Sequence, residues 1–180
     1  HPMDIRYVLL SPNGRIGPRD FGRGLILLTG AMMIVQIAVA LVSPAFGMLQ
    51  YPLVFSYVCV FGKRLHDGGH SAWFYLLFLA GYFVLSTAAT AILMPFLSPE
   101  ALSMQVEFQK LAMEGQFSAA VEEAAKIAPE LARLSVLTTI AAFLVASGVL
   151  GLIGARLRSD PSSNRFGPPS SGSGQPDTFS

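Results

Sequence analysis

Four long uncharged stretches divide the chain, and each is long enough to cross a membrane as a helix. They cover residues 24–42, 45–62, 72–97 and 134–155. An α-helix rises about 1.5 Å per residue, so about 20 apolar residues match a hydrocarbon core of about 30 Å. The pattern predicts an all-α membrane protein whose membrane domain, residues 24–155, contains four transmembrane helices.

The connections between the first three stretches are short. Ser43-Pro44 joins the first two, which predicts a tight helical hairpin because the residue before a proline leaves the helical region. Pro52 lies inside the second span, where a membrane helix usually accommodates proline with a kink. Residues 63–71 are polar and are expected to form a compact loop before the third span.

Residues 98–132 have a different pattern, which predicts an extracytoplasmic insert. Ser98-Pro99-Glu100 is typical of a helix start, with a serine cap and a proline in the first turn. Apolar residues then recur at helical spacing on both sides of Gly115: Met104, Phe108 and Leu111 before it, and Phe117, Val121, Ala124 and Ala128 after it. We predict two short amphipathic helices that either lie on the membrane or pack on the bundle as a solvated hairpin.

Composition and charge agree with this class of protein. The chain is 52% hydrophobic and only 13% charged. This composition excludes a disordered chain and disfavours a soluble domain. The net charge of +1 gives no general basic field, so no nucleic-acid partner is expected. The tail, residues 156–180, consists mostly of Ser, Gly and Pro from Pro168 onward and is expected to be largely disordered.

The distribution of Lys and Arg predicts the orientation. Nine of the twelve basic residues lie in residues 1–23, in the segment 63–71 and in the tail. The three others are predicted to lie on the opposite side of the membrane. The nine are Arg6, Arg15, Arg19, Arg23, Lys63, Arg64, Arg156, Arg158 and Arg165, and the three are Lys110, Lys126 and Arg133. Because basic loops stay in the cytoplasm, both termini are expected to be cytoplasmic.

The most unusual stretch is Lys63-Arg64-Leu65-His66-Asp67-Gly68-Gly69-His70-Ser71-Ala72-Trp73. It resembles the Arg-Arg-Leu-His-Asp-x-x-x-Ser-Gly-Trp signature of a bacterial membrane family called domain of unknown function 805. Gly14-Arg15-Ile16-Gly17-Pro18-Arg19-Asp20-Phe21 is similar to the family's amino-terminal Gly-Arg-x-x-Arg-x-x-Phe element. Asn164-Arg165-Phe166-Gly167 is similar to its closing Asn-Arg-aromatic-Gly.

The resemblance covers residues 7 to 168 and implies a fold but no activity, since the family is functionally uncharacterised. It also implies that the expected location is a bacterial cytoplasmic (inner) membrane. The chain departs from the family pattern at Lys63, where arginine is usual, and at Ala72, where glycine is usual. The insert of residues 98–132 is also longer than the family's common connection, so no family-wide role transfers to that face.

The predicted topology puts all three motifs on one side of the membrane, and we expect them to form a polar cluster. The candidate residues are Arg15, Arg19, Lys63, Arg64, His66, Asp67, Asn164 and Arg165. The simplest role is structural, with Asp67 paired to one or two arginines so that distant segments are tied together. The alternative is recognition of phosphate or anionic lipid by the guanidinium groups.

Other chemistry has less support. His66, Asp67 and His70 are weak metal candidates, because Gly68-Gly69 interrupts any common helix and no third obvious ligand is present. The chain has no Gly-x-Ser-x-Gly element, Walker motif or dinucleotide fingerprint, so neither a catalytic residue nor a cofactor is assigned.

Inside the spans, small and polar residues indicate helix packing. Gln36 is the carboxamide in mid-membrane and is expected to hydrogen-bond a neighbouring helix. Ser147, Gly151 and Ala155 repeat every four residues, a face that allows close packing within the chain, with a second copy or with a membrane-protein partner. The expected function is a non-enzymatic scaffold, accessory subunit or lipid-interacting protein. The alternative, a small transporter or channel component, is disfavoured by spans without charged residues.

Overall fold

A computed structural model describes residues 2–170 of the 180-residue chain. The described residues are helical apart from short connections and one isolated bridge between Asn164 and Gly167. The predicted all-α class is therefore confirmed, and four helical segments are long and apolar enough to cross a membrane. The chain forms two compact units. The first contains the residues up to Met32, Leu49–Tyr82 and those from Ser147 onward, and the second contains Met33–Met48 and Phe83–Ala146.

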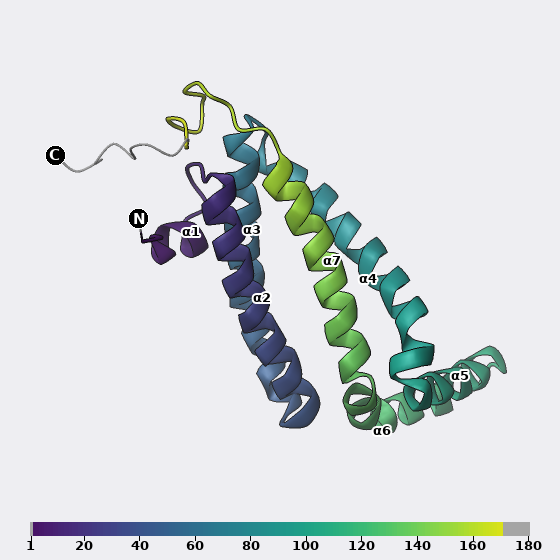
Figure 1. The fold of residues 1–180 in the computed structure, drawn as a ribbon. Helices are drawn as coiled ribbons and strands as arrows, with labels where there is room; N and C mark the ends of the chain where they lie inside the picture. The colour runs from purple at the N-terminus through teal and green to yellow at the C-terminus, as the bar shows by residue number, and fades with distance from the viewer. Residues whose placement is uncertain (1, 171–180) are drawn as a thin grey trace. The chain divides into compact units, whose positions relative to one another are not determined.

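The helices follow one another with very short connections (Figure 1). In chain order they are α1 Ile5–Leu10, α2 Pro18–Leu41, η1 Pro44–Leu49, α3 Gln50–Asp67, η2 Ala72–Phe74, α4 Tyr75–Leu97, α5 Pro99–Met113, α6 Phe117–Leu134 and α7 Val136–Arg156.

Helix α3 differs from the predicted second span at both ends. It begins at Gln50, so Pro52 lies in its first turn, where the missing N–H costs no helical hydrogen bond and no kink is required. It ends at Asp67 rather than Gly62, so residues 63–67 belong to the helix and not to the predicted loop. Residues 59–67 are buried on every side of the helix, which explains how charged residues can continue it.

The first unit packs α2, α3 and α7 around Phe21, which is fully buried. The Phe21 ring meets the Phe61 ring of α3 edge-on, with 5.1 Å between their centroids, a favourable arrangement for two aromatic rings. A Cβ atom on Gly154 of α7 would lie 2.6 Å from the Phe21 ring, so glycine at this position permits the close approach of α2 and α7. Gly151, one turn earlier, lies against Leu25 of α2 in the same way. This part of the small-residue face of α7 is thus used for packing within the chain.

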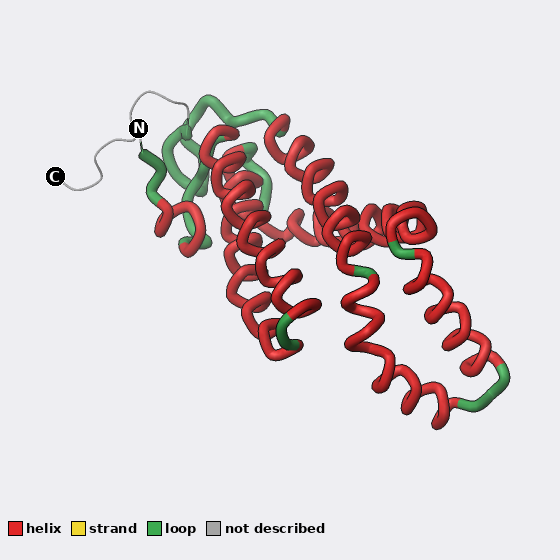
Figure 2. Tube along the Cα trace, turned by 60° about the horizontal axis from the view of Figure 1, so that its bottom comes forward, coloured by secondary structure: helices red, strands yellow, loops and turns green. Residues whose placement is uncertain are grey.

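The second unit contains the predicted pair of short helices as a hairpin, α5–α6, which turns through Gly115 (Figure 2). Single residues, Ser98 and Ser135, attach it to α4 and α7. Ser98 precedes α5 as predicted, but its hydroxyl does not cap the helix. It lies 2.7 Å from the Thr138 hydroxyl of α7 instead, and both residues are buried.

The two predicted apolar stripes of this hairpin have different surroundings. Met104, Phe108 and Leu111 of α5 line a cavity of about 230 Å³ that Ile127 of α6 also lines. Phe117 and Val121 of α6, by contrast, are 72% and 66% exposed. Part of the apolar face of α6 is therefore directed away from the hairpin.

The long helices leave many apolar side chains uncovered. Ile26, Ile34, Val84 and Phe96 are each at least 65% exposed. Soluble proteins rarely expose apolar patches of this extent, whereas lipid chains would cover them at no cost.

Gln36 lacks the predicted hydrogen bond, and its Oε1 atom is buried without a partner among the described residues.

Candidate functional site

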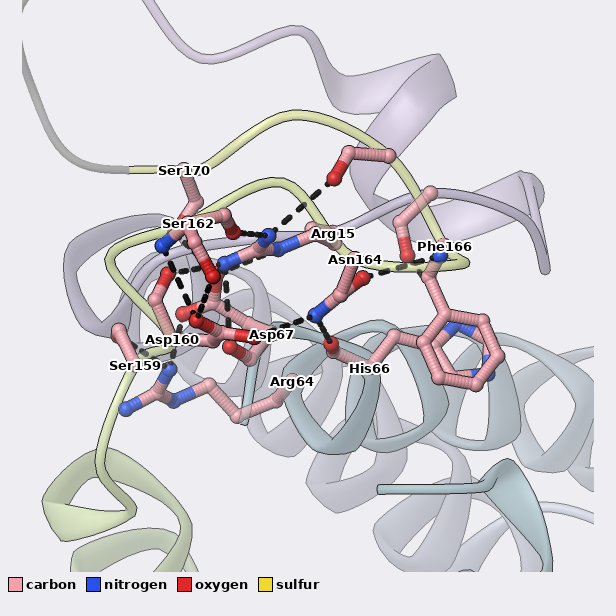
Figure 3. Close-up of polar contacts among 12 residues, drawn as sticks. Arg15, Arg64, His66, Asp67, Ser159, Asp160, Ser162, Asn164, Phe166 and Ser170 are labelled. Atoms are coloured by element: carbon pink, nitrogen blue, oxygen red, sulfur yellow. Dashed lines mark hydrogen bonds and ion pairs between the residues drawn. The ribbon is translucent and has the colours of Figure 1, made fainter. Parts of the chain in front are cut away.

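Asp67 is the centre of a buried ionic cluster in the first unit (Figure 3). Its side chain is fully buried, and one carboxylate oxygen accepts a hydrogen bond from Arg15 Nε at 3.1 Å. The other accepts from Arg64 Nη1 at 2.6 Å, and the Ser170 hydroxyl also donates to the carboxylate. We call Arg15, Arg64 and Asp67 the Asp67 cluster. The predicted pairing of Asp67 with arginines from near and distant segments is confirmed.

Arg15 joins the amino-terminal segment to α3 and to residues 157–170, which we call the post-α7 segment. Besides the Asp67 carboxylate, its guanidinium donates to the Asp67 backbone carbonyl at 3.2 Å. The guanidinium also donates to three carbonyls of the post-α7 segment, those of Asp160 at 2.6 Å, Ser162 at 2.8 Å and Gly167 at 3.2 Å. A guanidinium has five N–H groups, so every donor of Arg15 is used inside the chain.

Arg64 uses its remaining donors on the end of α7. Its Nε donates to the Gly154 carbonyl at 2.9 Å, and Nη2 donates to the carbonyls of Ala155, at 3.3 Å, and Leu157. Nη1 also reaches the Ser159 hydroxyl at 3.0 Å. The last carbonyls of a helix lack partners within it and carry partial negative charge, so a cation is favourable here. All five donors of Arg64 are again used internally.

Lys63 donates in a similar way to carbonyls of α1 and the residue that follows it, and it is not part of the Asp67 cluster. Its buried ammonium group donates to the carbonyls of Tyr7, Val8 and Ser11, which use its three N–H groups. The Tyr7 hydroxyl bonds the backbone N–H and carbonyl of Arg15, both at 3.0 Å, and burial raises the pKa of Tyr7. Lys63 and Tyr7 together fix α1 and the following loop on α3.

His66 connects the amino-terminal loop to the post-α7 segment. One ring nitrogen, Nδ1, lies 3.1 Å from the Gly14 carbonyl, and the ring stacks on Phe166 with 3.9 Å between centroids. Gly14 has a φ of 98°, and a Cβ atom there would collide with the Tyr7 hydroxyl. Only glycine therefore presents this carbonyl without strain. The Asn164 side-chain amide donates to the His66 carbonyl at 3.1 Å.

The post-α7 segment belongs to the tail that is predicted to be largely disordered, and the structure describes it up to Ser170. It has no regular structure except a turn in which Asn164 and Gly167 bond each other's backbone. It is nevertheless fixed by Arg15, by Arg64 and by the Asp160 N–H, which donates to the Asp67 carbonyl at 2.7 Å. Hydrogen bonds from the Ser162 hydroxyl and backbone N–H lower the pKa of Asp160. Residues 171–180, also predicted to be disordered, lie outside the described residues.

Three candidates are placed away from the Asp67 cluster. Arg19 is exposed in the first turn of α2. Arg165 is exposed too, with its guanidinium carbon 4.6 Å from the centroid of the Phe166 ring. His70 lies beyond the end of α3 and contacts Phe74 edge-on. These positions leave Arg15, Arg64, His66, Asp67 and Asn164 as the predicted residues that the fold brings together.

A metal has no suitable set of ligands in the described part of the chain, where no three His, Cys, Asp or Glu side chains gather. Of the weak candidates, Asp67 is occupied by arginines and His66 by the Gly14 carbonyl and the Phe166 ring. His66 and His70 do not share a helix, because α3 ends at Asp67 and Gly69 follows with a φ of 79°.

Sequence reasoning missed most acceptors of the site, because they are backbone carbonyls. Those of Gly154, Asp160 and Ser162 could belong to any residue type and have no signature in the sequence. One signal was available in the post-α7 segment, since Asn164 followed three residues later by Gly167 is typical of a turn.

The comparisons with known proteins add no relative. No family model, curated protein or solved structure matches this chain. The functional argument therefore rests on the contacts of the Asp67 cluster and on the distribution of charge.

Proposed function

We propose that the chain is a four-span protein of the bacterial cytoplasmic membrane that serves as a non-enzymatic scaffold or accessory subunit. One observation carries this proposal. All side-chain N–H groups of Arg15, Lys63 and Arg64 are used by acceptors inside the chain. A phosphate or substrate at these residues would first have to displace buried hydrogen bonds, so the structural role of the cluster is favoured over anion recognition.

We also propose membership of the domain of unknown function 805 family. The support is that the three resembling segments, although far apart in sequence, contact one another. Arg15 of the first bonds Asp67 of the second, and Asn164 and Phe166 of the third contact His66. Residues that combine in one structural cluster would be retained together in such a family.

For orientation, we propose cytoplasmic termini and an extracytoplasmic α5–α6 hairpin. The hairpin contains six glutamates against three basic residues, whereas the described part of the first unit has nine basic and four acidic residues. In intact cells, a membrane-impermeant thiol reagent is expected to label Ser118→Cys but not Ser163→Cys, in a Cys59→Ser background. Both positions are exposed, but the charge distribution puts them on opposite sides. Labelling of Ser163→Cys alone would reverse the topology.

The scaffold role is tested by the state of the chain after mild solubilisation of native membranes. The chain is expected to migrate on native gels in a complex larger than a monomer. Asp67→Asn, which opens the cluster, is expected to lose the complex, and Glu130→Gln, which removes an exposed carboxylate, is expected to keep it. A monomer in every case, together with a solute-dependent growth defect of the deletion strain, would favour the transporter alternative.

A further inference from the structure

Three arginines at the polar end of the first unit differ from the buried cations described above. Arg19 lies in the first turn of α2, Arg156 is the last residue of α7, and Arg158 follows two residues later. All three are exposed, and none of their side chains makes a hydrogen bond or ion pair with another described residue. We call them the outer arginines.

Helix packing brings the outer arginines to the same end of the unit. Phe21 of α2 packs directly on Gly154 of α7. Arg19 precedes Phe21 by two residues, and Arg156 follows Gly154 by two residues, so these arginines flank one interhelical contact. Figure 1 shows this junction where the beginning of α2 and the end of α7 lie beside the end of α3.

Exposed apolar side chains lie near these arginines on both helices. Leu152 and Ile153 of α7 are 63% and 49% exposed. Both lie within about one turn of Arg156. On α2, Ile26 is 74% exposed. It lies about two turns from Arg19. A long basic side chain beside a lipid-facing helix surface extends its charge to the headgroup level, so the guanidinium groups would meet lipid phosphates.

We propose that the outer arginines bind the headgroups of anionic phospholipids. Guanidinium groups donate two parallel hydrogen bonds to phosphate oxygens, and the outer arginines have these donors available, unlike Arg15 and Arg64. The charge of the unit favours the same ligand, because its described part contains nine basic residues and only four acidic ones, of which Asp67 is already paired. This proposal rests on the proposed insertion of the chain in a membrane, but not on the scaffold role.

The test measures lipid selectivity in a bilayer. The protein is reconstituted in phosphatidylcholine, and the association of spin-labelled phosphatidylglycerol is compared with that of spin-labelled phosphatidylcholine. A basic residue near an anionic surface changes lipid affinity by about fivefold. The wild type is therefore expected to prefer phosphatidylglycerol, and the triple variant Arg19→Gln, Arg156→Gln, Arg158→Gln is expected to lose at least about fivefold of that preference. High salt is expected to weaken the wild-type preference.

A matched control removes the same charge from the second unit. Lys110→Gln, Lys126→Gln, Arg133→Gln changes three exposed basic residues of α5 and α6 and is expected to keep the preference. The triple replacement of the outer arginines by lysine is expected to keep most of it. A wild type without preference, or an equal loss in both glutamine triples, would overturn the proposal. Failure of the chain to enter the bilayer would instead refute the proposed membrane location.

Discussion

Asp67→Asn is expected to lower the free energy of unfolding by about 3–5 kcal/mol, the cost of removing one partner from a buried ion pair. The substitution keeps the size of the side chain but removes the carboxylate that Arg15 and Arg64 share. Two buried guanidinium groups would then face each other without a counter-charge. Thermal and denaturant unfolding in one detergent, followed by circular dichroism, measures the loss.

The control is Glu130→Gln in α6. Its carboxylate also pairs with an arginine, Arg133, at 2.7 Å, but the two side chains are 47% and 60% exposed. Water and salt screen such a pair, so its loss is expected to change stability little. Equal destabilisation by the two substitutions would mean that burial of the Asp67 cluster contributes nothing to the fold.

Arg15→Gln is expected to release the post-α7 segment while the long helices remain folded. The guanidinium donates to three carbonyls of that segment. A hydrogen bond from a charged group contributes about 1.5–3 kcal/mol. Backbone amides of residues 157–170 are therefore expected to exchange with deuterium at least about tenfold faster. Hydrogen-exchange mass spectrometry in detergent micelles compares these residues with those of α2.

Arg19→Gln is the matched control for this prediction. Arg19 lies four residues from Arg15 in the same amino-terminal motif but is exposed, and its side chain makes no hydrogen bond or ion pair with the described residues of the post-α7 segment. Its replacement is expected to leave the exchange of residues 157–170 unchanged. Slow exchange in Arg15→Gln would show that the segment is fixed by other contacts, such as the stacking of His66 on Phe166.

The hydrophobic pattern predicted the helices well because length and absence of charge are strong signals. It failed at the end of α3, where charge is normally a sign of a loop. Lys63, Arg64 and Asp67 remain helical because tertiary partners replace the water that they would otherwise need. Such partners come from residues near the beginning and end of the chain, and no local pattern contains them.

Local sequence also does not show which arginine of the amino-terminal motif pairs with Asp67. Arg15 and Arg19 occupy one motif, and both were candidates for Asp67. The structure pairs Arg15 because it precedes α2 in a loop held by Tyr7 and the Gly14 carbonyl, whereas Arg19 already lies on an exposed face of the helix. Motif spacing identified the correct segments, but the start of α2 at Pro18, between the two arginines, decided which side chain entered the cluster.

The position of the post-α7 segment has a consequence for biosynthesis. Arg15 and Asp67 emerge from the ribosome long before Asp160, Ser162 and Gly167, which lie 145 to 152 residues after Arg15. Contacts between residues so distant in sequence form late. A nascent chain that already contains three of the four long apolar helices thus still has incompletely bonded guanidinium groups. Completion of translation beyond α7 is then the step that closes the structure, and a product truncated there would keep guanidinium donors of Arg15 without their carbonyl partners.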